Sequence, residues 1–310
     1  SLKWSEAGAP GSKETQLTKE AGWHQATASP DGRTFIDHYS QIFSPAQVRV
    51  CDQTGQTIFV LEENKADEWN SFPHPEPIFG SIQTPSGESL NTLLLAPLNR
   101  ENNATYPVIT YVYGGPTAQT VVNRYHRLQP FFTWLTAQGY GVFLLDNRGS
   151  GHRDRAFTRS IYHRFGDIEV EDHLLGAAHL KTIPWVDANR IGVFGWSYGG
   201  YLSALLIMED KTPYAAAASV APVTDWTLYD THYTERYIGK PQDEPALYTK
   251  GAVVPKATSL KRPFLLMHGM ADDNVLFENS LALIQAFQEE SIPFDLMVYP
   301  GRAHGLRGQG

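Results

Sequence analysis

The hexapeptide at residues 195–200 (GWSYGG) constrains the fold of this chain more than any other stretch. It fits the pattern G-x-S-x-G, in which a serine stands on a tight turn between a strand and a helix. The flanks agree, because residues 190–194 are typical of a short strand and residues 201–208 of a helix. Glycines on both sides of the serine allow the backbone to close where larger side chains would clash. The pattern predicts an exposed Ser197 hydroxyl at a strand end; the alternative is a glycine-rich turn that only joins two elements.

The composition is that of a globular protein with a sizeable core, since 42% of the 310 residues are apolar and 19% are charged. The net charge of −8 and the scattered basic residues argue against a nucleic-acid partner. A single cysteine, Cys51, excludes an internal disulfide, and no apolar stretch approaches the roughly 18 residues of a membrane span. No signal peptide is visible, but the chain starts at Ser1 without a methionine, so the compartment stays open.

The N-terminal part alternates short strands with turns, which is the pattern of an antiparallel meander. A strand, an S-P-D-G-R turn and a second strand are typical of a β-propeller blade, although a lone blade cannot bury both of its faces. We expect residues 1–61 to form such a blade, with a small β subdomain as the alternative. The strands are predicted at residues 23–28, 34–42, 48–51 and 57–61.

The two segments that flank this meander are predicted to be irregular. Residues 1–16 are polar and are expected to form a loop or an edge segment. Residues 62–77 contain Pro73, Pro75 and Pro77, which stiffen the chain and block regular pairing, so we expect a linker there.

From residue 78 to residue 310 strands alternate with helices, which predicts an α/β domain with a mostly parallel, doubly wound sheet. The strands are predicted at residues 90–96, 107–113, 140–145, 190–194, 215–221, 263–268 and 294–299, and the helices at residues 131–137, 167–182, 201–208 and 277–290.

A serine hydroxyl is a weak nucleophile at neutral pH, so Ser197 needs a base and an acid that orients the base. In α/β-hydrolases the acid and then the histidine follow the serine along the chain, each on a loop after a strand. Loops at residues 268–275 and 301–305 fit this order and give Asp272 as the acid and His304 as the base.

Two neighbours of the chosen acid need their own interpretation. Asp273 is the rival acid, and His268, at the strand end on the same loop, is predicted to be a core histidine. The remaining histidines are expected at the surface or in the core. No pair of them has the spacing and acidic company of a metal site, so neither a metal nor another cofactor is expected.

A tetrahedral intermediate also needs hydrogen-bond donors for its oxyanion. The backbone N–H of Tyr198, directly after the serine, is one candidate. The second donor normally comes from a loop after an early strand. Here that loop covers residues 111–116, where Tyr113 offers a hydroxyl.

Taken together, these residues resemble the dipeptidyl peptidase IV branch of the prolyl oligopeptidase family of serine peptidases. Trp196, Tyr198 and the segment YTERY separate this branch from lipases and esterases, and residues 17–61 resemble the last blade of the family's eight-bladed propeller. The sequence of the YGGP loop resembles that of bacterial members of the family. The matching segments are residues 111–116 (YVYGGP), 146–151 (DNRGSG), 165–172 (FGDIEVED), 195–201 (GWSYGGY), 220–223 (VAPV), 233–237 (YTERY), 268–275 (HGMADDNV) and 303–305 (AHG).

The resemblance implies a serine peptidase that releases N-terminal dipeptides with Pro or Ala at the penultimate position through an acyl-enzyme. It assigns the nucleophile to Ser197, the acid to Asp272, the base to His304 and the oxyanion hole to Tyr113 and Tyr198. The substrate-binding residues that it implies are Trp196, Tyr198, Val223, Trp226, Tyr229, Tyr233, Asn274 and Val275.

In that assignment the aromatic side chains form a slot that suits the flat ring of proline. Asn274 hydrogen-bonds the carbonyl of the first substrate residue. Core packing is the alternative role for the tyrosines and the tryptophan between residues 226 and 237.

Two departures from the family pattern stand out. The family binds the free amino group of the substrate with two glutamates on a propeller insertion, which this chain lacks; Glu169 and Glu171 lie in the predicted hydrolase domain and are not that pair. Family members also continue past the histidine into a final helix, whereas this chain stops at Gly310. We therefore expect a C-terminal fragment that is truncated at both ends.

The resemblance further implies peptide substrates, a homodimeric parent protein and a periplasmic or extracytoplasmic location. One alternative is a broader acyl hydrolase, such as an oligopeptidase or an esterase. The others are an inactive fragment of such an enzyme and a non-catalytic interaction protein on the same scaffold.

Overall fold

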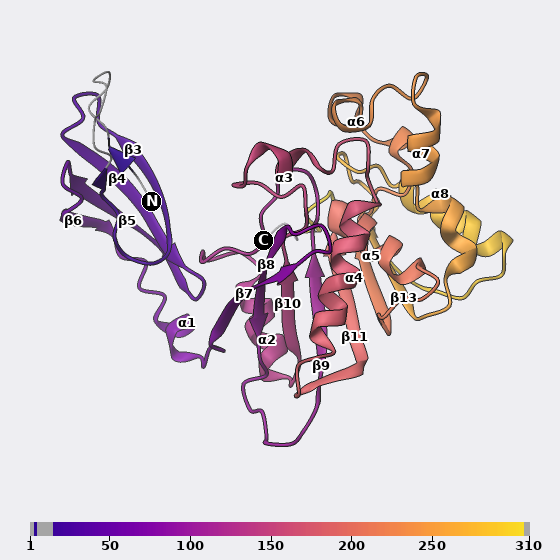
Figure 1. The fold of residues 1–310 in the computed structure, drawn as a ribbon, viewed down its shortest axis with the longest axis horizontal. Coiled ribbons are helices and arrows are strands. Elements are labelled where there is room, and N and C mark those ends of the chain that lie inside the picture. Colours follow the sequence, from indigo (N-terminus) through magenta and orange to yellow (C-terminus); the bar gives the residue numbers. More distant parts are fainter. Residues whose placement is uncertain (1–2, 5–14, 307–310) are drawn as a thin grey trace. The chain divides into compact units, whose positions relative to one another are not determined.

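The structure, a computed structural model, describes residues 3–4 and 15–306 (Figure 1). Its contacts divide the chain into two compact units. Unit 1 comprises Ser1–Pro77 and Val122–Trp134, and unit 2 comprises Ile78–Val121 and Leu135–Gly310. Residues 122–134, which lie inside the stretch predicted as the hydrolase domain, have most of their contacts with unit 1.

Hydrogen bonds explain why that segment belongs to unit 1. The backbone N–H of Ile42 donates to Asn123 Oδ1 at 3.0 Å, and the side-chain amide of Gln129 donates to the Ile42 carbonyl at 3.0 Å. Both bonds join positions more than eighty residues apart in the sequence, so no local sequence pattern predicts them.

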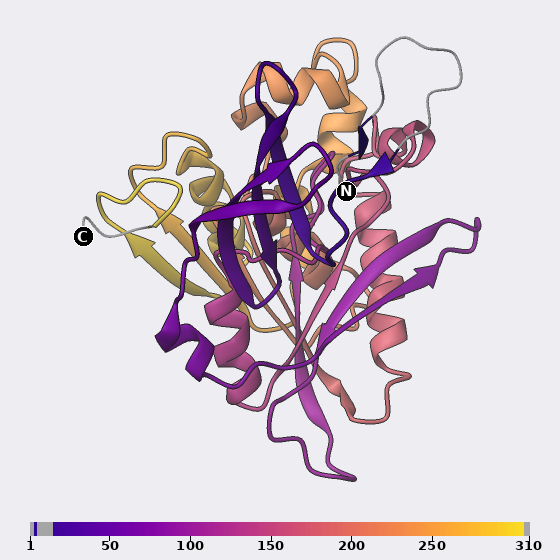
Figure 2. The ribbon, with the colours of Figure 1, turned by 90° about the vertical axis from the view of Figure 1, so that its left-hand side faces the viewer.

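Unit 1 is built on one antiparallel sheet in the order β3-β4-β5-β6, whose four strands lie side by side in Figure 2. The predicted meander and its propeller-like form are confirmed. The strands are β3 (Trp23–Ala28), β4 (Thr34–Gln41), β5 (Ser44–Asp52) and β6 (Thr57–Glu62).

Short elements stand on both sides of this meander. The two-residue strands β1 (Lys3–Trp4) and β2 (Thr15–Gln16) pair antiparallel, while residues 5–14 of the predicted loop lie outside the described part. The predicted linker holds a helix of one turn, α1 (Asp67–Ser71). Pro73, two residues after α1, cannot continue a helix, which agrees with its short length.

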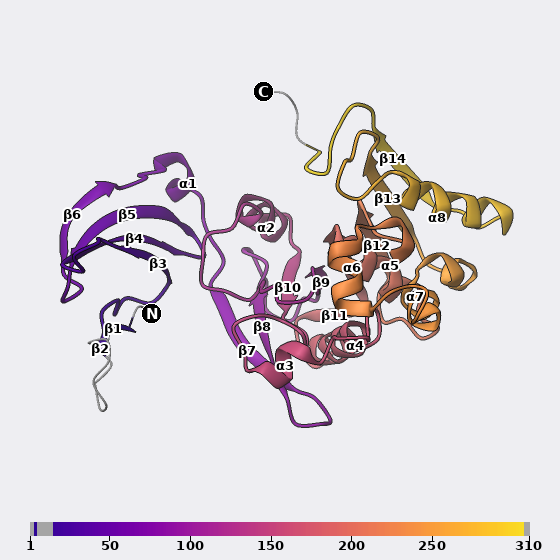
Figure 3. The same ribbon diagram turned by 90° about the horizontal axis from the view of Figure 1, so that it is seen from above.

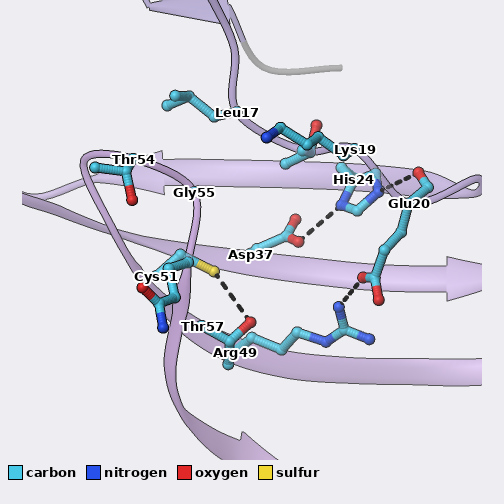
Figure 4. A pocket seen from close by; sticks show the side chains of 12 residues that line it. Leu17, Lys19, Glu20, His24, Asp37, Arg49, Cys51, Thr54, Gly55 and Thr57 are labelled. Atoms are coloured by element: carbon cyan, nitrogen blue, oxygen red, sulfur yellow. Dashed lines mark hydrogen bonds and ion pairs between the residues drawn. The ribbon is translucent and has the colours of Figure 1, made fainter.

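The sheet of unit 1 also borders a pocket of about 340 Å³ with a polar lining (Figure 4). His24 Nδ1 lies 2.7 Å from Asp37 Oδ2, and His24 Nε2 lies 3.1 Å from the carbonyl oxygen of Glu20. The guanidinium of Arg49 donates to the Glu20 carboxylate. The buried Cys51 thiol completes this part of the wall.

Unit 2 contains an eight-stranded sheet in the order β14-β13-β12-β11-β9-β10-β8-β7. All neighbours from β14 to β10 pair in parallel, and β10 pairs with β8 antiparallel. The predicted α/β class with a mostly parallel sheet is confirmed. The strands are β7 (Pro77–Gln83), β8 (Ser89–Leu95), β9 (Tyr106–Val112), β10 (Gly141–Leu145), β11 (Val186–Trp196), β12 (Ala216–Val220), β13 (Phe264–Gly269) and β14 (Asp295–Tyr299).

Helices α4 and α5 lie side by side on one face of this sheet (Figure 1 and Figure 3). Helix α5 is buried at every residue, so it forms the centre of the core. Strand β7 and helices α3, α6 and α7 were not predicted from the sequence. The helices are α2 (Gln129–Ala137), α3 (Arg155–Arg159), α4 (Ile168–Leu180), α5 (Tyr198–Met208), α6 (Thr231–Ile238), α7 (Pro245–Gly251) and α8 (Glu278–Glu289), with 3-10 turns η1 (Trp226–Leu228) and η2 (Val254–Ser259).

A groove of about 350 Å³ runs over strands β9, β11, β12 and β13 of the same sheet. Its walls include the apolar side chains of Ile109, Phe194 and Leu265. At the neighbouring edge, Leu296 and Met297 of β14 are exposed. Within residues 15–306, no helix combines the length and the apolarity that crossing a membrane requires.

Candidate active site

The predicted catalytic side chains all follow strands of the parallel part of the unit 2 sheet. Tyr113 follows β9, Ser197 follows β11, Asp272 follows β13 and His304 follows β14. Because these strands are parallel, their carboxyl ends meet at one edge of the sheet, where ligand sites of α/β folds are found. Residues separated by almost two hundred positions are thus gathered at one edge.

The turn that carries the serine is tight and strained. Strand β11 ends at Trp196 and helix α5 begins at Tyr198, so Ser197 alone connects them. Its backbone angles are φ 62° and ψ −119°, a conformation that costs energy for a residue with a Cβ atom. The Ser197 N–H donates to the Val220 carbonyl at 2.8 Å, which fixes the turn to strand β12.

The glycines of the motif are required by close backbone contacts. A Cβ atom at Gly195 would lie 2.3 Å from the Gly199 carbonyl oxygen, and one at Gly199 would lie 2.1 Å from the Val112 carbonyl oxygen. Gly200 is equally close to strand β12, with 2.5 Å to the Val220 carbonyl oxygen. No side chain fits at these positions, which agrees with the steric reason that the sequence suggested.

Asp272 and His304 form an ionisable pair at this edge. His304 Nδ1 lies 2.7 Å from Asp272 Oδ2. The other carboxylate oxygen, Oδ1, accepts the backbone N–H groups of Asn274 and Val275, each at 3.0 Å. Asp272 is buried, whereas Asp273 is exposed. The geometry therefore favours Asp272 over its neighbour as the partner of His304.

His268 contacts the Asp272 carboxylate from within the core. It is fully buried, with Nε2 at 3.1 Å from Asp272 Oδ2 and at 2.9 Å from the Val275 carbonyl oxygen. Its Nδ1 lies 2.7 Å from the Ser280 hydroxyl on helix α8. Burial lowers the pKa of His268, so the ring is neutral at physiological pH. These contacts agree with a core histidine that holds the acid loop.

The loops after β13 and β14 are also tied to each other and to the serine turn. The N–H of Ala271 donates to the Arg302 carbonyl at 3.0 Å. The indole N–H of Trp196 donates to the His304 carbonyl at 3.0 Å. Trp196, which was predicted to bind substrate, therefore holds the main chain of the histidine loop against the end of β11.

The loop after β9 presents Tyr113 at the same edge. Asn147 fixes this loop, because its side-chain amide donates to the Gly114 carbonyl at 3.1 Å. Burial raises the pKa of Tyr113, so its hydroxyl keeps its proton and can donate a hydrogen bond at neutral pH. The N–H of Tyr198, in the first turn of α5, has no acceptor within its own helix. Both groups can serve as oxyanion donors.

Four of the predicted pocket residues, Tyr198, Trp226, Tyr229 and Tyr233, form one aromatic cluster. The ring centroids of Tyr198 and Trp226 are 5.5 Å apart, and those of Tyr229 and Tyr233 are 5.6 Å apart. Trp226 and Tyr233 are stacked at 6.4 Å. Phe165, which the sequence analysis did not name as a pocket residue, joins the cluster at 4.8 Å from Trp226.

The members of this cluster differ in exposure. Val223, Trp226 and Val275 are buried, so they also pack in the core, as the alternative interpretation holds. Tyr229 and Tyr233 are only partly buried and remain accessible. The Tyr229 hydroxyl donates to Asn274 Oδ1 at 2.9 Å, which orients the exposed amide of Asn274.

Sequence reasoning missed one buried acid beneath the cluster. Glu169 has an exposed fraction of 0%, and its Oε1 accepts the Tyr198 hydroxyl at 2.5 Å and the Gly166 N–H at 3.1 Å. Burial raises the pKa of Glu169 to about 7. The signal that could have found it is a glutamate two positions after a glycine–aspartate turn, beside a second glutamate that is exposed.

Nothing in the described ranges, residues 3–4 and 15–306, groups three or more His, Cys, Asp or Glu side chains so that they could hold a metal ion. The arrangement at the strand ends is instead that of covalent catalysis. It offers a hydroxyl on a strained turn, an imidazole with a buried carboxylate behind it, and two N–H or O–H donors.

Known proteins resemble this chain over most of its length. The model of the prolyl oligopeptidase family matches residues 127–310. The chain is 37% identical to dipeptidyl peptidase 8 of Homo sapiens over 94% of this chain and 34% of that protein, and 32% identical to the probable dipeptidyl peptidase 4 of Neosartorya fischeri over 94% and 39%. It therefore spans between a third and two fifths of the length of these relatives.

A solved structure extends the similarity to the fold. The crystal structure of Porphyromonas gingivalis dipeptidyl peptidase 4 superposes with a TM-score of 0.90 at 31% identity, over 96% of this chain and 42% of that one. A putative dipeptidyl aminopeptidase IV from Bacteroides ovatus superposes with a TM-score of 0.85 at 31% identity, over 91% and 40%. The chain thus belongs to the prolyl oligopeptidase family, in its dipeptidyl peptidase IV branch.

Proposed function

We propose that this chain carries the catalytic domain of a serine dipeptidyl aminopeptidase that releases N-terminal dipeptides with Pro or Ala at the penultimate position. The observation that carries the proposal is the 2.7 Å contact between His304 and the buried Asp272, on loops at the same sheet edge as the Ser197 turn. The names of the matched relatives support the dipeptidyl peptidase activity.

In the proposed mechanism, the Ser197 hydroxyl attacks the carbonyl carbon of the penultimate residue while His304 Nε2 takes its proton. Asp272 holds the Nδ1–H of the ring and stabilises the imidazolium that forms. The Tyr113 hydroxyl and the Tyr198 N–H donate to the oxyanion. The tetrahedral intermediate then collapses, the C–N bond breaks, and His304 returns the proton to the leaving amine.

The resulting acyl-enzyme is hydrolysed by the same groups. His304 takes a proton from a water molecule, which attacks the ester carbonyl, and the Ser197 oxygen leaves with the returned proton. The dipeptide is released with a free carboxylate. No step requires a metal or an organic cofactor.

Substrate selection is assigned to the aromatic cluster. Tyr198, Trp226 and Tyr233 would enclose the side chain of the penultimate residue, with Val223 and Val275 at the base of the slot. A proline ring buries apolar area in such a slot without losing rotamer freedom. The orienting bond from Tyr229 to Asn274 leaves the Asn274 NH₂ group to donate to the carbonyl of the first substrate residue.

The remaining proposals concern the organisation of the protein. We propose that residues 1–61 are the last blade of a propeller, residues 62–77 a connector and residues 78–310 the hydrolase domain. We also propose that the complete protein is a homodimer. Sedimentation of the complete gene product tests the homodimer.

The function is tested with three chromogenic substrates, which are a Gly-Pro amide, its N-acetylated form and a simple ester. The proposal expects turnover of the Gly-Pro amide and loss of turnover when its amine is acetylated. A preference for the acetylated substrate or for the ester would instead indicate an oligopeptidase or an esterase.

A fluorophosphonate probe tests the nucleophile independently of the substrate. It should label the complete gene product, and Ser197→Ala should abolish both labelling and turnover. A well-folded protein that is not labelled would support a non-catalytic role.

A further inference from the structure

We infer that Glu169 is a positioning residue whose buried carboxyl holds the Tyr198 hydroxyl and so fixes the Tyr198 ring in the wall of the pocket for the penultimate residue. The inference rests on the proposed function of that pocket. It assigns to helix α4 a share in substrate selection, although no residue of α4 belongs to the cluster described above.

The contact joins two neighbouring helices that strand β11 separates in the sequence. Glu169 lies in the first turn of α4, and Tyr198 is the first residue of α5. The Tyr198 hydroxyl donates to Glu169 Oε1 at 2.5 Å, and both side chains are buried. A hydrogen bond to a carboxyl group in a site without water is stronger than the same bond at the surface.

The loop before α4 holds the carboxyl in place. The Gly166 N–H donates to the same Oε1 atom at 3.1 Å. Gly166 has φ +75°, and a Cβ atom there would lie 2.4 Å from the Tyr201 hydroxyl and 2.7 Å from Leu205 Cδ1. Only glycine lets this loop pack so closely on α5, and the close packing brings its N–H to Glu169.

The Tyr198 ring itself packs among aromatic side chains. The ring is surrounded by the aromatic side chains of Phe165, Tyr201 and Trp226, at centroid distances of 5.3, 5.2 and 5.5 Å. Aromatic rings pack against a phenol but offer no strong acceptor for its O–H. The Tyr198 hydroxyl instead donates to the Glu169 carboxyl group.

The result is a ring that is held at both ends. Its Cα atom is fixed by the serine turn, and its hydroxyl is fixed by α4. A wall that is held before substrate arrives lowers the cost of binding, which is the physical meaning of preorganisation. Loss of the tether should therefore weaken substrate binding more than it slows the chemical step.

The second glutamate of the same helix serves as a matched control. Glu171 has a side-chain exposure of 59%, and its carboxylate pairs with Arg148 at 2.6 Å. It differs from Glu169 by two positions, which turns its side chain away from α5. Glu171→Gln makes the same side-chain change in the same helix without touching Tyr198.

The test measures kcat and KM of the complete gene product for Gly-Pro and Gly-Ala chromogenic amides. Glu169→Leu leaves the Tyr198 hydroxyl without an acceptor and should raise KM between about 5-fold and about 100-fold. The rise should be larger for the Gly-Pro amide, since its ring fills the slot. Glu169→Gln, whose amide oxygen still accepts the hydroxyl, should restore KM to within about 2-fold, and Glu171→Gln should leave it unchanged.

A double-mutant cycle separates positioning from general stabilisation. Tyr198→Phe removes the same bond from the other side, so Glu169→Leu should add little to the KM of a Tyr198→Phe protein. If Glu169→Leu does not fold, Tyr198→Phe alone carries the test and should raise KM while kcat stays within about 2-fold.

Two failures can be told apart with the fluorophosphonate probe. An unmodified protein that is neither labelled nor active overturns the proposed function, and this inference with it. An active, labelled protein in which a folded Glu169→Leu variant keeps its KM overturns the inference alone. A loss in thermal stability with proportional loss of active sites, and no change in KM, would also overturn it.

Discussion

The two sheets of this chain bury their strands to opposite degrees. In unit 2 every residue of strand β10 is buried. Helix α5, which packs on the neighbouring strands, is also buried at every residue. In unit 1 every residue of β6 is exposed, and Leu61 has an exposed fraction of 62%. One cluster of buried apolar side chains in unit 1 comprises Leu17, Phe35 and Cys51.

The difference shows where the chain obtains its stability. Burial of apolar surface contributes roughly 25 cal/mol per Å², so unit 2 holds its main stabilising term within itself. Unit 1 leaves much of its apolar surface in contact with solvent, as a propeller-like blade must when it is considered alone. The proposed catalytic residues, Tyr113, Ser197, Asp272 and His304, all belong to the unit with the self-contained core.

The largest expected effect tests this comparison directly with two leucines. Leu205 on α5 is fully buried, so Leu205→Ala should lower the free energy of unfolding by about 2–5 kcal/mol. Leu61→Ala in β6 should change it by no more than about 0.5 kcal/mol. Urea unfolding of both variants measures the difference. Equal losses would mean that the two units share one core.

The next effect concerns the chemistry at the strand ends of unit 2. Tyr113→Phe should slow acylation by about 10²- to 10³-fold, because one oxyanion donor is lost. Tyr39→Phe in unit 1 is the matched control, since that hydroxyl donates to the Ala21 carbonyl at 2.9 Å. It should leave the rate unchanged. Pre-steady-state burst kinetics measure both, and an unchanged burst rate in Tyr113→Phe would remove that tyrosine from the mechanism.

A smaller effect tests the charge state of the unit 2 core. The pKa of Glu169 is raised from 4.5 to about 7, so between these values the folded chain keeps a proton that the unfolded chain has released. The free energy of unfolding therefore falls as the pH rises through this window, by about 3 kcal/mol from this group. Glu169→Gln cannot ionise and should gain that amount relative to the unchanged chain between pH about 4 and about 8.

The difference between the two proteins is the quantity to measure, because His173 titrates in the opposite sense. Burial lowers the pKa of His173 from 6.5 to about 3. The contribution of His173 to the free energy of unfolding therefore increases as the pH rises from about 3 to 6.5. This contribution is common to both proteins and cancels. A difference that does not change with pH would show that Glu169 is not buried as an acid.

Much of unit 2 follows from local patterns in the sequence. The second half of β11 and the whole of β13 are short, mostly apolar runs that end at glycine-containing turns, and such runs predict both the strand and the loop after it. The order of serine, acid and histidine then selects Asp272 and His304 without any knowledge of distance. The structure places these two side chains in contact, which the sequence order alone could not show.

What the sequence did not reveal depends on contacts between distant positions. Helix α6 is an exception, because its signals are local: Asp230 is an N-cap that accepts the Tyr233 N–H at 2.8 Å, and Tyr233, Tyr237 and Ile238 recur at helical spacing. The role of Glu169 depends on a tyrosine twenty-nine positions away. Residues 122–134 group with unit 1 through bonds to Ile42, which no pattern near residue 122 indicates.

The position of His268 beneath Asp272 determines where the protons of the site reside. Its Nε2 faces two acceptors, Asp272 Oδ2 and the Val275 carbonyl, so Nε2 must carry the hydrogen, and the neutral ring must accept the Ser280 hydroxyl at Nδ1. The same carboxylate oxygen requires a hydrogen on His304 Nδ1, which leaves a lone pair on His304 Nε2. The carboxylate oxygen that lies between the two rings thus sets the direction in which the proposed catalytic imidazole accepts a proton.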